Sequence, residues 1–344
     1  MSRSSNKSIT LKEVAAAAGV SVSTASRALS GKAEAYRISS ATEQSVREAA
    51  EKLRFSPSLL ARSLRSQQTK LLGVVLPNVA NPFFAAIARE ITLEAEAQGF
   101  SVLLADSQEN SETEARLVDQ LQARQIEGLV VCPVGLESEH LKNLTQKKLP
   151  LVLVDRGFED PELVSVTSDH RAGAREGMEL LLEAGHQTIG ILQGMPDTLP
   201  NRERLAGIAA ALTARGLAFD ATLVAGHHFD ETSGYQAAQK LLTERPEITA
   251  LFAFSNQNAL GALRAAAELG RTIPGDLSLI SFDDHPFAAY LAAPLTSVSQ
   301  DVSQLGRVAA RLLLEQIQAG QPPAQKQHQI PVQLVQRASI APPA

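Results

Sequence analysis

The chain has 344 residues, of which 44% are hydrophobic and 4% aromatic, with a formal net charge of −5. This length exceeds what one ordinary domain needs and predicts two or three compact units. The single cysteine, Cys132, excludes a disulfide framework and favours a reducing compartment, where a buried structural thiol is its expected role. The polar first residues are unlike a secretory signal, and no apolar run reaches the ~20 residues that span a bilayer, so we expect a cytoplasmic protein.

The charge is distributed unevenly along the chain. Residues 1–70 hold 12 Lys and Arg against 5 Asp and Glu, whereas the remaining residues hold 20 against 32. A basic N-terminal unit on an acidic body suits nucleic-acid binding at one end, because contacts with phosphates supply much of the affinity. Charge alone leaves a solvated basic surface without a partner as the alternative.

Residues 11–30 predict two short helices joined by a tight turn. Residues 11–18 are rich in alanine, and Gly19 follows where a left-handed residue can end a helix. Ser21 is then the expected N-cap of a second helix over residues 22–30. Two such helices with a glycine-containing turn form a helix-turn-helix, whose second helix enters the major groove of DNA. A plain helical hairpin is the alternative.

The second helix has one face for packing and one for DNA. Ala25 and Leu29 are spaced to face inward with Val14 of the first helix. On the other face an arginine can bind a guanine edge, a serine can donate or accept, and a valine can contact a thymine methyl. The side chains that we expect to contact bases or phosphates in this unit are Thr10, Val22, Ser23, Thr24, Arg27, Lys32 and Arg37.

A third helix is expected to begin with a capping box formed by Ser40 and Glu43. Apolar side chains at positions 46, 49, 50 and 53 then form the stripe of a helix that lies on a core. We expect the DNA-binding unit to cover residues 8–56. A hinge helix opened by Pro57 and a polar linker should follow over residues 57–70.

Past residue 70, apolar runs of strand length alternate with stretches of helical period. The expected strands cover residues 71–76, 102–105, 129–131, 151–154, 189–192, 250–254 and 277–282. The expected helices cover residues 83–98, 112–124, 137–146, 171–184, 202–215, 232–244 and 257–269. This alternation indicates parallel sheets with helices on both faces, and its restart indicates two similar lobes. We expect the first lobe to hold residues 71–168 and 299–327, and the second to hold 169–298 and 328–344.

Polar and aromatic residues follow five of the expected strands. They lie at residues 78–84, 106–107, 155–156, 255–256 and 283–284. In open α/β sheets a ligand binds at the carboxyl ends of the strands, so these residues should line one cleft. Carboxylates, arginine and amides suit sugar hydroxyls, and phenylalanine offers a ring face for stacking.

Residues 10–65 resemble the head and hinge of the lactose-repressor (LacI) family, and the resemblance continues through the body. Segments that carry it there are Asn-Pro-Phe-Phe84, Leu-Val-Asp-Arg156, Asn-Arg-Glu-Arg-Leu-Ala-Gly207 and Leu-Ser-Leu-Ile-Ser-Phe-Asp283. The resemblance implies a helix-turn-helix headpiece with a hinge helix, followed by two doubly wound parallel-sheet lobes of periplasmic-binding-protein type. It also implies a repressor, not an enzyme, whose operator affinity is controlled by a small molecule bound between the lobes.

The resemblance assigns roles to individual residues. It implies that Leu64 wedges into the minor groove, as apolar side chains do in DNA-kinking proteins. The effector contacts that it implies are Phe84, Asp155, Arg156, Arg204, Phe229, Ser255 and Asp283. Ser255 stands where the lactose repressor has an asparagine, and Arg156 where the purine repressor has a stacking tryptophan. These departures argue against a β-galactoside and a purine, and favour a sugar, a sugar acid or a sugar phosphate.

The loop over residues 31–38 is longer than in many members of the family and is similar to the fructose-repressor subgroup. Ala25 is a further departure, because the family usually has valine there. No heptad run follows the last segments of the chain, so a homodimer on a palindromic operator is the expected assembly. Whether the effector induces or co-represses stays open.

No phosphate-binding glycine loop and no nucleophile elbow occur in the chain, so we expect no cofactor and no catalysis. His227 and His228 are adjacent and would point to opposite faces of a strand, which does not suit a metal site. A periplasmic-type sugar-binding protein and an α/β enzyme are the alternatives. The basic head argues against the first, and the missing phosphate loop argues against the second.

Overall fold

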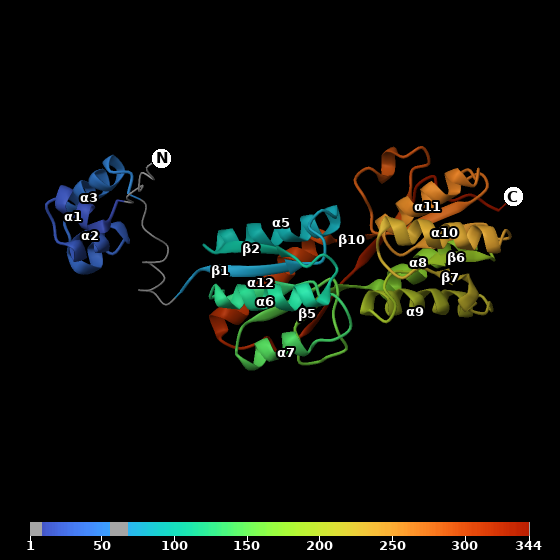
Figure 1. Cartoon of the computed structure of the whole chain (residues 1–344), viewed down its shortest axis with the longest axis horizontal. Coiled ribbons are helices and arrows are strands. Elements are labelled where there is room, and N and C mark those ends of the chain that lie inside the picture. Colours follow the sequence, from blue (N-terminus) through green and yellow to red (C-terminus); the bar gives the residue numbers. More distant parts are fainter. Residues whose placement is uncertain (1–8, 56–67, 344) are drawn as a thin grey trace, which may run out of the picture. The chain divides into compact units, whose positions relative to one another are not determined.

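The structure is a computed structural model that describes residues 9–55 and 68–343 (Figure 1). It divides into two compact units, residues 1–69 and residues 70–344, which are described in turn. Leu64 and most of the expected hinge helix lie outside the described residues. Within the described ranges there is no helix long and apolar enough to cross a membrane.

The described residues of the first unit form helices α1 (Leu11–Ala17), α2 (Val22–Leu29) and α3 (Ser40–Lys52), and a short 3-10 turn, η1 (Glu34–Tyr36). Gly19 has a φ of +64°, which ends α1 as predicted. The Ser21 hydroxyl accepts a hydrogen bond from the Thr24 amide at 3.1 Å and begins α2, also as predicted. The predicted cap of α3 is wrong by one residue, because Ser39 and not Ser40 accepts from the amide of Thr42.

The core of this unit is small and built largely of alanine. The side chains of Val14, Ala25, Ala28 and Val46 are fully buried where the three helices meet. Leu29, which was expected to face inward with Ala25, packs at the edge of this core and is only partly buried. Ala28, which like Leu29 lies about one helical turn after Ala25, is fully buried beside it.

The second unit consists of two lobes, each a six-stranded sheet covered by helices on both faces (Figure 1). The first sheet has the order β11-β5-β4-β3-β1-β2 and is parallel throughout. Its strands are β1 (Leu71–Leu76), β2 (Ser101–Asp106), β3 (Gly128–Val131), β4 (Leu151–Val154), β5 (Ser165–Ser168) and β11 (Gln327–Ile330). Its helices are α5 (Pro82–Ala97), α6 (Ser111–Ala123), α7 (Glu139–Gln146) and α12 (Val302–Ala319).

The second sheet has the order β12-β10-β9-β8-β6-β7, and only its edge strand β12 is antiparallel to its neighbour. Its strands are β6 (Ile189–Leu192), β7 (Val224–Ala225), β8 (Ala250–Ala253), β9 (Ser278–Phe282), β10 (Thr296–Gln300) and β12 (Val332–Val335). Its helices are α8 (His170–Glu183), α9 (Leu199–Ala214), α10 (Glu231–Glu244) and α11 (Asn256–Glu268), with short 3-10 turns η2 (Ala221–Leu223) and η3 (Ala288–Tyr290).

The two lobes repeat one design. Strands β1 to β5 occupy the same places in the first sheet as β6 to β10 in the second. Gly73 in β1 and Gly190 in β6 each allow a leucine of the neighbouring strand to pack against the backbone. A Cβ at Gly73 would come within 2.8 Å of Leu129, and one at Gly190 within 2.7 Å of Leu251. Strands β1, β3 and β4 are almost entirely buried, as the apolar runs in the sequence predicted, whereas the edge strand β2 is partly exposed.

The chain passes between the lobes three times, after β5, after β10 and after β11. The expected lobe boundaries at residues 298/299 and 327/328 fall inside β10 and β11, so they need correction. β10 stays with the second sheet to Gln300, and β11 extends the first sheet to Ile330. Hydrogen bonding between strands, which no local pattern shows, sets these crossings.

Candidate functional site

Helix α2 carries four of the residues expected to contact DNA, namely Val22, Ser23, Thr24 and Arg27. The side chain of Val22 is 41% exposed, and Ser23 is exposed beside it. Thr10 and Thr24 are engaged locally: Thr10 donates to the Glu13 carboxylate at 2.9 Å, and the Thr24 hydroxyl lies 2.8 Å from that of Ser21. These threonines therefore stabilise the first turns of α1 and α2.

Arg27 is held by an aromatic side chain that the sequence reading did not single out. Its guanidinium lies 4.0 Å from the centroid of the Tyr36 ring, in η1 of the loop between α2 and α3. Lys32 and Arg37 of the same loop are exposed, and Arg37 has a φ of +53°. The loop therefore orients the arginine that the sequence predicts for base contact and presents two cations beside it.

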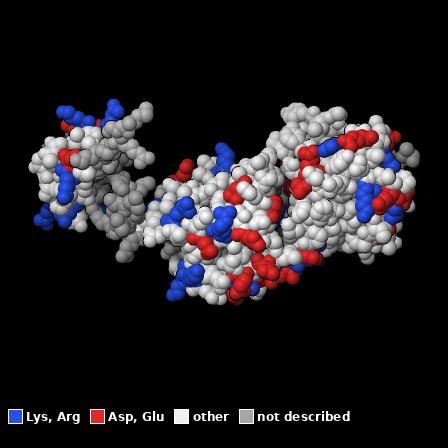
Figure 2. Space-filling model, viewed as in Figure 1, with Lys and Arg blue, Asp and Glu red and all other residues white. Residues whose placement is uncertain are grey.

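The charge asymmetry of the sequence is visible on the surface. On the face shown in Figure 2, Lys and Arg predominate among the charged side chains of the first unit, whereas Asp and Glu recur over the second. The described part of the first unit forms an ion pair between Arg47 and Glu43 on α3. A net positive unit with an exposed polar helix is suited to a phosphate backbone.

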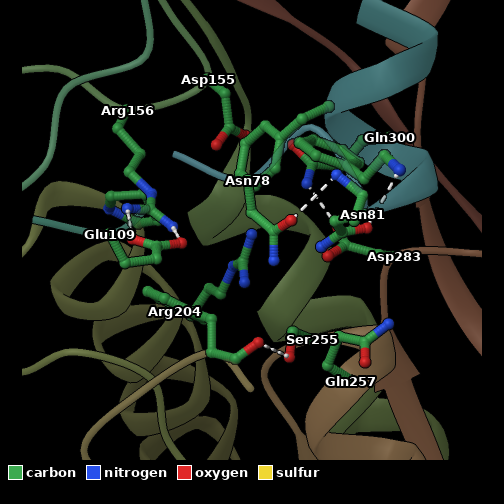
Figure 3. Close-up of a pocket in the computed structure, with 15 residues that line it drawn as sticks. Asn78, Asn81, Glu109, Asp155, Arg156, Arg204, Ser255, Gln257, Asp283 and Gln300 are labelled. Carbon is green, nitrogen blue, oxygen red and sulfur yellow. Dashed lines mark hydrogen bonds and ion pairs between the residues drawn. The ribbon is translucent and has the colours of Figure 1, made fainter. Parts of the chain in front are cut away.

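A cavity of about 230 Å³ opens between the two lobes of the second unit (Figure 3). All seven residues expected to contact an effector line it. The lining residues are Asn78, Ala80, Asn81, Phe83, Phe84, Glu109, Asp155, Arg156, Pro200, Arg204, Phe229, Ser255, Gln257, Asp283 and Gln300. They come mainly from the carboxyl ends of strands in both sheets, because parallel strands end on the same side of a sheet.

Two aspartates occupy equivalent places in the two lobes. Asp155 follows β4 and Asp283 follows β9, and both adopt left-handed backbone conformations, with φ of +64° and +70°. Each amide donates at 2.9 Å to the neighbouring strand, to the carbonyl of Val166 and that of Val298. Such conformations in residues other than glycine concentrate at functional sites.

Burial determines the ionisation of these carboxyls. Desolvation raises the pKa of Asp155 to about 6, although nearby Arg156 lowers it in part. Desolvation raises the pKa of Asp283 in the same direction, opposed by Arg204. Asp155 Oδ1 is buried and has no hydrogen-bond partner among the described residues, so it can accept a donor from a ligand.

Arg204 of α9 lies under the cavity and is 3% exposed. One guanidinium nitrogen donates to the carbonyl of Phe254, and another lies 3.3 Å from Nδ1 of His170. The Nε of Arg204 has no partner among the described residues. A fixed guanidinium with an unused donor is suited to a hydroxyl or carboxylate of a bound ligand.

Arg156 is placed on the opposite wall and is already paired. It donates two hydrogen bonds to the carboxylate of Glu109, at 2.7 and 2.9 Å (Figure 3, at left). Its guanidinium also lies 5.7 Å from the ring centroid of Phe84 and 5.4 Å from that of Phe229. The side chain therefore links an aromatic residue of each lobe.

Ser255 lines the cavity, but its hydroxyl has other contacts. It accepts from the amide of Asn258 at 2.9 Å as the N-cap of α11, and it lies within hydrogen-bonding distance of the Asn258 side chain and the Phe229 carbonyl. The serine therefore has little capacity left for a ligand. Gln257, in the first turn of the same helix, is the more available polar group there.

Gln300 is a cavity residue that the sequence reading missed. Its amide donates to Oδ1 of Asp283 at 2.5 Å, and its Oε1 is buried without a partner among the described residues (Figure 3, at right). It ends β10, a strand that was not expected. This segment, Thr-Ser-Val-Ser-Gln, has a single apolar residue, so there was little signal in the sequence for the strand or for Gln300.

Neither His227 nor His228 lines the cavity, and both are exposed. Within the part of the chain that the structure describes, no group of three or more His, Cys, Asp or Glu side chains could hold a metal ion. Cys132 is buried at the end of β3, where burial raises the pKa of its thiol.

Two family descriptions match the chain. That of bacterial regulatory proteins of the lacI family covers residues 10–58, and that of periplasmic binding protein-like domains covers residues 178–340. The ribose operon repressor of Halalkalibacterium halodurans is 33% identical over 328 residues, which are 95% of this chain and 96% of the relative. The chain belongs to the LacI family. The repressor CytR of Escherichia coli K12 is 32% identical, with 90% of each chain covered.

Solved structures of LacI-family proteins share the fold. The lac repressor dimer bound to operator and an anti-inducer is 29% identical, with a TM-score of 0.87 over 97% of this chain and 100% of that chain. The regulator CelR in complex with cellobiose is 29% identical, with a TM-score of 0.73 over 96% and 99%. The chain is thus a DNA-binding transcriptional regulator, and its relatives are repressors and not enzymes.

Proposed function

We propose that this LacI-family member is a cytoplasmic repressor that binds a palindromic operator as a homodimer and responds to a sugar or sugar derivative between its lobes. The observation that carries the effector site is the interlobe cavity, where seven expected contacts from separate segments meet. A cavity of about 230 Å³ suits a small ligand, because pockets for drug-sized molecules run from ~300 to 1,000 Å³.

The cavity lining supports a polyhydroxylated ligand. Asp155 Oδ1 and Gln300 Oε1 are unused acceptors, and Arg204 Nε is an unused donor. Phe84 and Phe229 add ring surfaces at the same cavity. This mixture of acceptors, donors and rings is what sugar recognition requires. Among the relatives, a regulator from Enterococcus faecium has been solved with bound ribose, and CelR with cellobiose.

The DNA contacts that we propose lie in the head, on helix α2 and on the loop that follows it. Val22, Ser23 and Arg27 of α2 contact base edges in the major groove, and Lys32 and Arg37 contact phosphates. The family resemblance adds Leu64, outside the described residues, as the minor-groove wedge. The loop over residues 31–38 supports a grouping of this head with the fructose-repressor subgroup.

The response of the repressor follows from the three chain crossings. A ligand that contacts both lobes stabilises one relative position of the lobes over another, and it changes operator affinity by the difference in its binding to the two states. Gln300 lies at one crossing and on the cavity wall, and His170, beside Arg204, lies at another. The ligand site is therefore built into the segments that connect the lobes.

One experiment tests the proposal as a whole. Operator sequences are selected from randomised DNA by the full-length chain, and the selected site is then titrated in gel shifts with neutral sugars, sugar acids, sugar phosphates and nucleosides. We expect an inverted repeat whose affinity for the protein changes with one sugar-class ligand. Failure to enrich any inverted repeat would refute the DNA-binding part of the proposal.

A further inference from the structure

We infer that Glu109 makes the interlobe cavity selective for uncharged ligands by occupying the guanidinium of Arg156. The inference rests on the proposed function of the cavity and specifies the chemical class of ligand that it admits. Without Glu109, the cavity wall would present an arginine with free donors. Arginine in that state is the usual side chain for binding carboxylates and phosphates in proteins.

The geometry of the pair leaves Arg156 little capacity for a second anion. Both contacts of Glu109 are short, at 2.7 and 2.9 Å, and they use two parallel N–H groups of the guanidinium. This fork is the arrangement in which an arginine would also bind a ligand carboxylate or phosphate. The Glu109 side chain therefore occupies the place of an anionic ligand group.

Arg156 is buried while its partner is accessible. The side chain of Arg156 is 5% exposed, against 36% for Glu109. The rings of Phe84 and Phe229 lie near the guanidinium and limit its contact with water. A buried cation without a counterion is costly, so removal of the Glu109 charge creates a strong demand for another anion.

The backbone around Glu109 is shaped for this contact. Gln108 and Glu109 are consecutive left-handed residues, with φ of +54° and +53°. The turn is held because the Gln108 amide donates to Oδ1 of Asp106 and the Glu109 amide donates to the carbonyl of Pro77, each at 2.9 Å. Two strained residues in succession, neither of them glycine, indicate that the position of this side chain matters to the site.

The remaining charges of the cavity also oppose an anion. With Arg156 and Glu109 paired, the lining still contains the carboxyls of Asp155 and Asp283 and the single guanidinium of Arg204. Both carboxyls interact electrostatically with that guanidinium. A sugar phosphate would therefore bring its charge to a cavity with no surplus cation, whereas a neutral sugar would not.

The test uses Glu109→Gln in the full-length chain, with inorganic phosphate as the probe. The amide cannot neutralise Arg156, so we expect phosphate to bind the variant at least about tenfold more tightly than the wild type, since charge-assisted bonds to a buried guanidinium are strong. Calorimetric titration measures the affinity, and the thermal midpoint should rise with phosphate only in the variant. Equal phosphate affinity in the two proteins would overturn the inference.

Two controls separate the cavity from general charge effects. Glu203→Gln removes the carboxylate of a surface pair with Arg171, whose contacts are 2.9 and 3.3 Å, and it should not change phosphate binding. Glu109→Gln combined with Arg156→Gln should lose the gained phosphate affinity. A gain of the same size in Glu203→Gln, or a gain that survives loss of Arg156, would place the phosphate elsewhere and overturn the inference.

The wild-type chain provides a test that does not depend on folding of a variant. Ribose is compared with ribose 5-phosphate, and glucose with gluconate and glucose 6-phosphate, by thermal shift and by operator release. Tighter binding of an anionic member than of its neutral counterpart would overturn the role of Glu109 but leave the proposed repressor function standing. If the wild-type chain binds no operator at all, that result would instead count against the proposed function.

Discussion

The guanidinium of Arg204 lies 3.8 Å from the centroid of the Phe282 ring, directly before Asp283 in the sequence. The ring and the Phe254 carbonyl hold the arginine in place, while Asp283, the residue after β9, supplies a carboxylate to the same cavity. Helix α9 and the end of strand β9 thus form the second lobe's half of the ligand site. Burial lowers the pKa of Arg204 from its ordinary value, opposed by Asp283 and Asp155.

We expect Arg204→Lys to weaken effector binding and to leave operator binding unchanged. Lysine cannot reproduce the planar stacking on Phe282 or the fork of donors. Loss of a hydrogen bond to a charged group such as this guanidinium costs about 1.5–3 kcal/mol, which is roughly 10- to 100-fold in affinity. Gel-shift titration with the effector measures the change, and Arg171→Lys on the surface of α8 is the matched control. An unchanged effector midpoint in Arg204→Lys would show that Arg204 does not contact the ligand.

Because Gly194 has no side chain, the Phe229 ring can pack directly against it. A Cβ at Gly194 would come within 2.0 Å of that ring, so Gly194→Ala must displace Phe229 from its place beside Arg156 and Arg204. We expect effector affinity to fall by about tenfold, which corresponds to the loss of one aromatic contact worth about 1.4 kcal/mol. The effector midpoint of operator binding measures this.

The control for that substitution is Gly157→Ala. A Cβ at Gly157 would meet its nearest neighbour, a methyl of Leu199, at 3.5 Å, which is an ordinary contact. This variant should retain the effector response. If both alanine variants behave alike, the displacement of Phe229 is not the cause of the effect.

Asp155 makes stability depend on pH in a defined direction. Because burial raises the pKa of this carboxyl from 3.8 to about 6, the folded chain keeps a proton that the unfolded chain has already lost. The contribution of Asp155 to the free energy of unfolding therefore falls as pH rises, by about 3 kcal/mol between about pH 4 and pH 6. Above that window the reduced contribution stays constant.

Asp155→Asn removes this titration, so the difference in the free energy of unfolding between variant and wild type isolates the contribution of Asp155. The free energy of unfolding of the variant, relative to the wild type, should increase from about pH 4 to about pH 6 and then stay constant. Urea denaturation at a series of pH values measures it, with Asp119→Asn on the exposed face of α6 as the control. A difference that does not change with pH would contradict the raised pKa of Asp155.

The stacking of Arg27 on Tyr36 predicts a graded effect on DNA recognition. Arg27→Ala should reduce discrimination at one base pair of the operator by about 1–3 kcal/mol. Tyr36→Ala should have a smaller effect, about 0.5–1 kcal/mol, because an exposed cation–π contact only orients the arginine. Fluorescence anisotropy with operators changed one base pair at a time measures both. Tyr36→Phe keeps the ring and should resemble the wild type; a loss equal to that of Tyr36→Ala would point to the hydroxyl instead.

Much of the fold was predictable because its signals are local. The strands over residues 71–76, 151–154 and 189–192 have the predicted bounds, since buried parallel strands are continuous apolar runs. The first two helices of the head begin at the predicted residues and end one residue before the predicted ends, since caps and left-handed glycines act on adjacent residues. Strands β5, β10 and β11 near the crossings were not predicted, because they are short and mostly polar. Strand β12 and helix α12 were also missed, although both are rich in apolar residues.

The sequence by itself determined that an exposed helix of the head presents Ser23 and that residues at the ends of several strands line one cavity. Parallel strands of one sheet end at the same edge, so their ends lie together whatever side chains the strands contain. Only the tertiary structure decided which of these residues are available. Arg156 is neutralised by Glu109, 47 residues away, and Asp283 is bound by Gln300 after a further strand. Such pairings depend on distances in space between segments whose separation along the chain has no period, so no pattern in the sequence could show them.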